Sequence, residues 1–274
     1  MSRIGSRLST YKRTGKTALV SFVTAGDPSV ATTVPALHAL VRGGVDILEL
    51  GVPFSDPEAE GPVIQKSSER ALANGVNLVA VLDMVRDFRQ TDTNTPVLMM
   101  GYFNSLLHLG PEHLVKNAVE AGVDGVIIVN LPPEEATDIQ PVFAAAELDL
   151  VFLIAPTTTE ARARSIVSVA GGFIYYVSLK GVTGAQHLKV ETVRKEVLRV
   201  QSYTALPVMV GFGVKDPQDA QRIAAYADGV VVGSALVRTM EALQSSERQI
   251  PGALEAQVRK LRDAMDESDQ DQRE

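Results

Sequence analysis

The sequence predicts an α/β protein: a (β/α)8 barrel with an extra N-terminal helix and additional outer helices. Eight short apolar runs alternate with eight segments of helical spacing along the 274 residues. Most runs are continuously apolar, which is typical of parallel strands buried on both faces. No Pro-, Gly- or Ser-rich linker divides the chain, and no G-x-G-x-x-G turn follows a strand as an open doubly wound sheet would favour.

The predicted elements follow in order. An amphipathic segment at 2–14 is expected to form a helix packed outside the barrel. Helical segment 30–44 closes on Gly-Gly, 132–148 opens on two prolines followed by acidic residues, and 215–227 has Asp-Pro at its start. A last outer helix is expected near 252–265. The strands are expected within 18–26, 45–52, 96–103, 125–131, 148–156, 172–179, 206–213 and 228–236.

The domain organisation follows from the same pattern. Residues 1–265 are expected to form a single barrel domain. Residues 266–274, "DESDQDQRE", are charged and almost free of apolar side chains, so we expect a disordered tail there.

Composition disfavours several classes of function. The net charge of −7 argues against a nucleic-acid binder, and no basic stripe interleaved with aromatics is present. The absence of Cys excludes disulfides and thiolate metal sites, and the four histidines lack the H-x-x-x-H spacing of a metal site. The apolar run "ALVSFVTAG" is too short to span a membrane and no signal peptide precedes it, so a soluble cytoplasmic protein is expected.

Glycine-containing segments follow the seventh and eighth strands. "GFGVKDP" follows the seventh strand, and Gly233-Ser234 leads from the eighth into a helix. Small residues let the backbone approach an anion closely, and a helix N-terminus favours negative charge. Ordinary tight turns are the alternative, but the two motifs together at the usual phosphate site of this fold favour a phosphate.

Two other features of the strand ends suggest a pocket and a lid. The loop 179–188, "LKGVTGAQHL", is longer than a typical strand-to-helix loop, so it is either a lid or a surface loop without a catalytic role. Apolar and aromatic side chains near strand ends are candidates for a flat apolar pocket, with plain core packing as the alternative. They are Phe22, Met100, Tyr102, Tyr175 and Phe212.

Carboxylates on and after the second strand are the candidate catalytic groups. Glu49 shares a strand face with Ile47, whereas Leu48 and Leu50 share the other. If Glu49 points into the barrel, burial should raise its pKa and let it carry a proton at neutral pH. Glu60, in the next loop, is placed to return over the same pocket as a second carboxylate.

A set of motifs with ordered spacing resembles the tryptophan synthase α subunit family over residues 3–265. The resemblance implies a barrel that cleaves indole-3-glycerol phosphate to indole and glyceraldehyde 3-phosphate without a cofactor of its own. It also implies a tryptophan synthase β subunit as partner in an α2β2 complex, with pyridoxal phosphate on the β subunit. The motifs are "FVTAGDP", "ELGVPFSDP", "GPVIQ", "AGVDGVII", "LPPEEA", "GVTGA", "VGFGV" and "DGVVVGSALV".

The resemblance also implies roles for individual residues. Glu49 matches the general acid/base that protonates the indole ring at C3, Glu60 the carboxylate that stabilises the ring nitrogen, and Tyr175 a group near the reacting centre. Thr183 is expected to close onto the second carboxylate. The phosphate cradle is matched by Gly184, Gly213, Gly233 and Ser234, the indole pocket by Phe22, Tyr102 and Phe212, and the β-facing loops by Pro53, Asp56, Asn104 and Pro132.

Three positions depart from the family pattern. The family usually has Asp where this chain has Glu60 and Asn130, and an apolar residue where it has Glu58. These departures leave open a catalytically impaired subunit that mainly activates its β partner. Another phosphosugar barrel enzyme is the third alternative, although none of the predicted strand runs contains the Lys that a Schiff-base aldolase requires.

Overall fold

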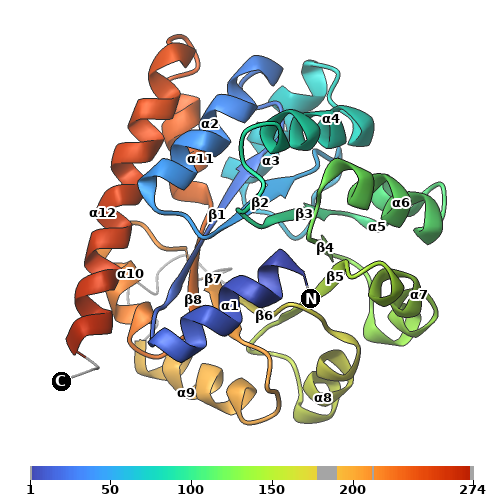
Figure 1. The fold of residues 1–274 in the computed structure, drawn as a ribbon, viewed down its shortest axis with the longest axis vertical. Coiled ribbons are helices and arrows are strands. Elements are labelled where there is room, and N and C mark those ends of the chain that lie inside the picture. Colours follow the sequence, from blue (N-terminus) through green and yellow to red (C-terminus); the bar gives the residue numbers. More distant parts are fainter. Residues whose placement is uncertain (1, 178–189, 212, 272–274) are drawn as a thin grey trace.

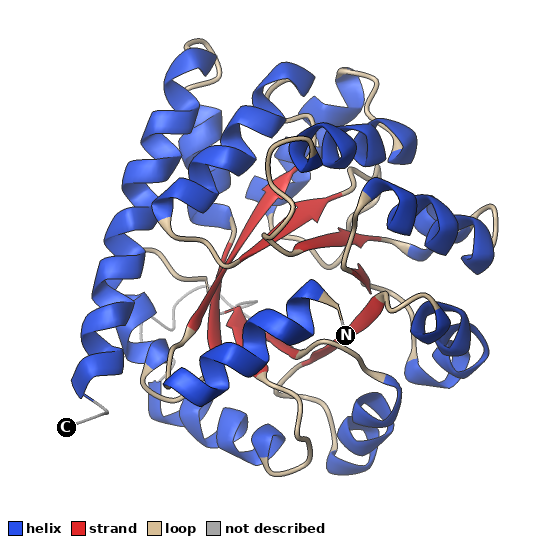
Figure 2. Cartoon of the chain, in the orientation of Figure 1, coloured by secondary structure: helices blue, strands red, loops and turns tan. Residues whose placement is uncertain are grey.

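Among residues 2–177, 190–211 and 213–271, which the computed structural model describes, eight parallel strands form a closed barrel in chain order. The strands are β1 (Ala18–Thr24), β2 (Ile47–Gly51), β3 (Val97–Gly101), β4 (Gly125–Ile128), β5 (Asp149–Ile154), β6 (Ile174–Val177), β7 (Val208–Gly211) and β8 (Gly229–Val232). Figure 2 shows this ring of strands in red, enclosed by helices. The predicted barrel is confirmed.

Helices cover the outside of the barrel (Figure 1). They are α1 (Arg3–Thr14), α2 (Val30–Gly43), α3 (Pro62–Ala73), α4 (Leu78–Arg89), α5 (Phe103–Leu107), α6 (Pro111–Ala121), α7 (Pro133–Ala145), α8 (Glu160–Val169), α9 (Val190–Gln201), α10 (Pro217–Ala224), α11 (Ser234–Ala242), the 3-10 helix η1 (Glu247–Gln249) and α12 (Ile250–Asp271). Two strand-to-strand connections hold a pair of helices where the sequence predicts one: α3 with α4, and α5 with α6.

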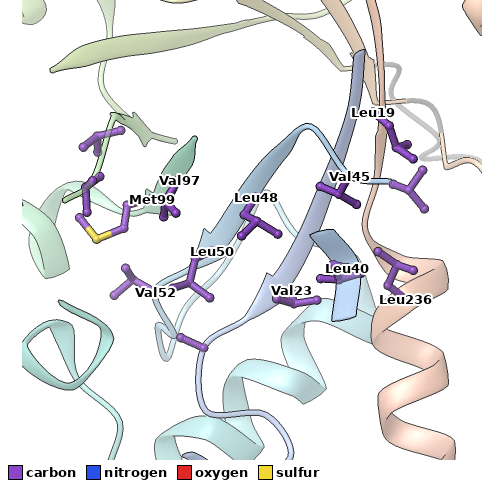
Figure 3. Packing of buried hydrophobic residues seen from close by; sticks show 14 of the residues in the cluster. Leu19, Val23, Leu40, Val45, Leu48, Leu50, Val52, Val97, Met99 and Leu236 are labelled. Atoms are coloured by element: carbon purple, nitrogen blue, oxygen red, sulfur yellow. The ribbon is translucent and has the colours of Figure 1, made fainter. Parts of the chain in front are cut away.

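Alternate residues of each strand face two different layers. On β2, Ile47 packs with the residues that fill the barrel interior, whereas Leu48 and Leu50 belong to the larger layer between strands and helices. Figure 3 shows Leu48 and Leu50 in that outer layer, near Val97 of β3. The parity predicted for the second strand is therefore confirmed.

Helix α1 closes one end of the barrel. Its Ile4 and Leu8 are buried and join the interior cluster. Arg3 forms an ion pair with Asp124 at 2.8 Å, at the end where the strands begin. Figure 1 shows α1 lying across this opening. Helix α1 therefore lies outside the ring of strands, as expected for residues 2–14, but its Ile4 and Leu8 side chains extend into the barrel interior.

Three aspartates standing directly before strands hold the same end together. Each precedes an even-numbered strand and accepts a hydrogen bond from a backbone N–H at the start of the preceding strand. The pairs are Asp46 with Leu19 (2.9 Å), Asp124 with Val97 (2.8 Å) and Asp228 with Val208 (2.8 Å). The strand starts are thus fixed by polar contacts, which leaves the opposite end free for chemistry.

Helix α12 packs against α2 and α10 along one side of the barrel (Figure 1). It continues through residues 266–271, which the sequence assigns to the tail. Ser268 is buried there, and Asp266 pairs with Arg262 at 2.6 Å. Over the described part of the chain, no helix is both long and apolar enough to cross a membrane.

Candidate active site

Glu49 is the most unusual side chain of the barrel interior. It lies in register with Phe22 of β1 and Leu98 of β3, and only 1% of it is exposed. Neither carboxylate oxygen has a hydrogen-bond partner among the described residues. Burial, assisted by the charge of Glu60, raises the pKa of Glu49 to about 8. Glu49 therefore keeps its proton at neutral pH.

Glu60 lies in the loop between β2 and α3 and is half-buried. Its N–H donates to the Pro57 carbonyl at 2.9 Å, and its own carbonyl accepts from the Gln65 side chain at 2.8 Å. Burial raises the pKa of Glu60 to about 7. The charge of Glu60 contributes to the raised pKa of Glu49, so the two carboxyl groups are electrostatically linked. The loop after β2 thus returns its carboxylate toward the strand that carries Glu49.

Tyr175 of β6 belongs to the same electrostatic group. Burial, and then the charges of Glu49 and Glu60, raise the pKa of its hydroxyl well above 10, so the group stays a hydrogen-bond donor. Gly211 on the adjacent strand β7 makes room for the ring, since a Cβ there would lie 2.6 Å from Tyr175 Cε1. Any larger residue at position 211 would displace the tyrosine.

A hollow of about 280 Å³, which includes space open to solvent, is lined by Glu60 but not by Glu49 or Tyr175. It brings together four predicted site residues, namely Phe22, Glu60, Met100 and Tyr102. Sequence reasoning did not single out the other lining residues, among them Thr24, Phe54 and Ile64. Ile64 stands within the quoted motif "GPVIQ", so its place directly after the carboxylate loop was the available signal.

Three of the four predicted phosphate residues, Gly213, Gly233 and Ser234, follow the last two strands. Ser234 is the first residue of α11, and Gly233 stands directly before it. A Cβ on Gly233 would approach Phe22 Cβ to 3.2 Å, so the helix start lies against the predicted ring pocket. Gly213 follows β7 with a φ of +57°. The predicted residues Thr183, Gly184 and Phe212 lie outside the described residues.

The predicted partner-facing residues fall near two grooves at the same end. Asp56 and Asn104 line an open groove of about 1,210 Å³. Pro132 lines a neighbouring groove of about 720 Å³, and Asn130 lines both. Pro53 is buried and lines neither groove.

The family comparison agrees with this arrangement. A family model described as tryptophan synthase alpha chain matches residues 8–266. The chain belongs to the tryptophan synthase alpha chain family.

Similar proteins cover nearly all of this family member. The tryptophan synthase alpha chain of Thiobacillus denitrificans is 53% identical over 90% of either chain, and that of Nitrosococcus oceani is 50% identical over 97% of this chain and 98% of its own. The crystal structure of the alpha subunit from Legionella pneumophila has a TM-score of 0.92 at 43% identity, covering 97% of this chain and 99% of its own. An aminoacrylate-bound tryptophan synthase structure from Mycobacterium tuberculosis gives a TM-score of 0.84 at 33% identity, covering 97% and 100%.

The described part of this alpha chain offers no obvious metal centre. No group of three or more His, Asp or Glu side chains within it is arranged to hold a metal ion.

Proposed function

We propose that this chain cleaves indole-3-glycerol phosphate to indole and glyceraldehyde 3-phosphate. The single observation that carries the proposal is Glu49: a buried carboxyl without a described hydrogen-bond partner and with a pKa of about 8, influenced by a second carboxylate. An isolated buried carboxyl is unfavourable for folding unless it carries a proton. A carboxyl that carries a transferable proton at neutral pH suits general acid catalysis.

In the retro-aldol reaction, Glu49 gives one proton and takes one back, so it ends the cycle in the form in which it began. Glu49 gives its proton to C3 of the indole ring, and the ring becomes a cationic indolenine. The carboxylate form of Glu60 stabilises the ring nitrogen as it becomes electron-poor. The hydroxyl on the adjacent side-chain carbon then loses its proton to Glu49, a carbonyl forms there, and the electrons of the broken carbon–carbon bond return to the ring. Indole and the aldehyde leave, and Glu49 is protonated again.

Other residues hold the substrate in this proposal. Phe22, Met100 and Tyr102 line the hollow beside Glu60 and suit the flat ring. Ser234 at the start of α11, with Gly213 and Gly233, suits the phosphate, because a helix N-terminus stabilises negative charge. Tyr175 donates a hydrogen bond near the reacting carbon. Thr183, Gly184 and Phe212 are assigned from the family resemblance alone.

We also propose that the chain works in a cytoplasmic α2β2 complex and passes indole to a β subunit that carries pyridoxal phosphate. Asp56 and Asn104, in a groove close to the Glu60 loop, support a partner surface there. Docking on such a surface would order the loop that places Glu60.

The test is indole release from indole-3-glycerol phosphate, measured with the purified chain alone and again with a tryptophan synthase β subunit. We expect slow release that rises sharply when the β subunit is present. Glu49→Gln should abolish release while inorganic phosphate still binds, and Glu60→Asp should keep or raise the rate. Substantial turnover by Glu49→Gln would refute the acid/base assignment. No release by the unaltered chain in either condition would leave a subunit that serves its partner only.

A further inference from the structure

The position of Glu60 depends on how its loop is held above the barrel. Two residues of this loop contact Tyr102, which follows β3. The Ala59 N–H donates to the Tyr102 hydroxyl oxygen at 3.1 Å, and the Phe54 ring stacks on the Tyr102 ring at 5.0 Å between centroids. Tyr102 is 3% exposed, whereas Asp56, Glu58 and Ala59 are exposed. An exposed stretch is thus anchored on one buried side chain, next to Glu60.

Tyr102 is itself held from the next strand. It stands directly before the short helix α5, whose first residue is Phe103. The side-chain oxygen of Asn130, just beyond β4, accepts a hydrogen bond from the Phe103 N–H at 2.7 Å. The Val129 N–H also donates to the Gly101 carbonyl at 2.9 Å. The contacts therefore run without a gap from the end of β4, through Phe103 and Tyr102, to Ala59.

We propose that the Tyr102 hydroxyl and Asn130 are positioning residues that act on the reaction through Glu60. This inference rests on the proposed function, because it assigns these contacts a role in the cleavage reaction. Removing the hydroxyl leaves the ring, its stacking on Phe54 and the wall of the hollow, but it releases the Ala59 N–H. Glu60, one residue further, keeps its backbone contacts with Pro57 and Gln65 but loses the anchor of its neighbour Ala59. Displacements of about 1 Å at a reacting group can lower a rate about 100-fold.

The same contact explains why Asn at position 130 can replace the Asp that the family usually has there. The task at this position is to accept one backbone hydrogen bond, and the amide oxygen of Asn does this as the carboxylate oxygen of Asp would. The negative charge is not needed for it. We therefore expect Asn130→Asp to preserve the contact and Asn130→Leu to break it.

The first test measures the loop directly, without any turnover. Amide hydrogen exchange is followed in Tyr102→Phe, Asn130→Leu and Asn130→Asp. In Tyr102→Phe the Ala59 amide loses the net stabilisation of one hydrogen bond, so its hydrogen exchange should be about 3- to 10-fold faster. Asn130→Leu should speed it by a smaller factor, and Asn130→Asp should match the unaltered chain. Asn117→Leu is the control, since that side chain donates to the His113 carbonyl of its own helix, α6. Unchanged exchange at Ala59 in Tyr102→Phe would overturn the inference.

The second test separates positioning from general loss of structure. Indole release by the chain alone should show a kcat about 10- to 100-fold lower in Tyr102→Phe, with KM within about 3-fold, because the ring and phosphate contacts remain. The double variant Tyr102→Phe/Asn130→Leu should lose less of its kcat than the product of the two single effects, because both substitutions act through one loop. Faster exchange with an unchanged kcat, or independent effects that multiply fully, would overturn the inference. Failure of the proposed function gives a different result, because the unaltered chain itself would then release no indole.

Discussion

At the residue scale, the Glu49 carboxyl links folding to pH. Its pKa is about 8 in the folded chain against an ordinary value of 4.5, so the folded state favours the protonated form. The free energy of unfolding should therefore fall as pH rises from 4.5 through 8. Glu49→Gln has no such loss, so its stability relative to the unaltered chain should grow by up to about 5 kcal/mol between pH 4.5 and 9. Urea unfolding at a series of pH values measures this difference.

A matched control separates burial from charge alone. Glu58→Gln removes a carboxylate from the exposed part of the neighbouring loop. Because Glu58 is exposed, this variant removes a negative charge from the same loop without changing a buried group. Parallel curves for Glu49→Gln and the unaltered chain would mean that Glu49 is solvated in solution.

The two carboxyl groups also predict the pH dependence of the rate. The mechanism requires Glu49 protonated, with a pKa of about 8, and Glu60 ionised, with a pKa of about 7. The kcat/KM for indole release should be bell-shaped, with its maximum between about pH 7 and 8. Assays from pH 5.5 to 9.5 test this, and Glu60→Gln should lose the acid limb along with most of its rate. A flat profile would contradict the division of roles.

At the element scale, the sequence predicted strands better than helix connections. Strands buried on both faces appear as continuous apolar runs, so all eight were recognisable. The pair α3 and α4 was not recognised, because only three residues separate Ala73 from the Asn77 that caps α4. Helix α5 has five residues, too few to show a helical period.

The candidate site, like the fold, contains some features that local sequence patterns predict and others that they do not. Strand alternation puts Glu49 on the same face as Ile47, and the structure identifies that face as the barrel interior. The contacts of Tyr102 with Phe54 and Ala59 depend on how a loop folds back across a neighbouring strand. No local pattern encodes such a contact, so it required the structure.

Helix α1 gives an element-scale prediction. Ile4 is fully buried in the barrel interior, so Ile4→Ala should lower the free energy of unfolding by about 2–4 kcal/mol. Ile4→Val, which removes one methyl group, should cost only about 0.5–1.5 kcal/mol. Both should leave the kcat of indole release unchanged, because α1 closes the end opposite the strand ends that carry the site. A loss below about 1 kcal/mol in Ile4→Ala, measured by urea unfolding, would mean that α1 does not seal the barrel in solution.

At the scale of the whole molecule, the two ends of the barrel have different tasks. The end where the strands begin holds α1 and the aspartates that fix the strand starts. The opposite end holds the hollow, the exposed loops and the Glu49 carboxyl, which has no hydrogen-bond partner in the described part of the chain. Features unfavourable for folding are thus concentrated at the catalytic end, as in proteins that sacrifice some stability for function. Substitutions at the two ends should therefore separate into effects on stability and effects on rate.

The extent of the domain is the prediction that concerns the chain as a whole. We propose that the folded domain includes the last turns of α12, because Ser268 is buried and Asp266 pairs with the buried Arg262. A chain that stops after Met265 should lose about 1–2 kcal/mol of unfolding free energy and should keep its kcat. The loss comes from the removed burial and from the removed Asp266 carboxylate, while Arg262 keeps its contacts with Asp46 and the Thr17 carbonyl. A chain that stops after Asp271 is the matched control. If urea unfolding shows equal stability for both truncations, the domain ends at residue 265 and residues 266–271 add nothing to the fold.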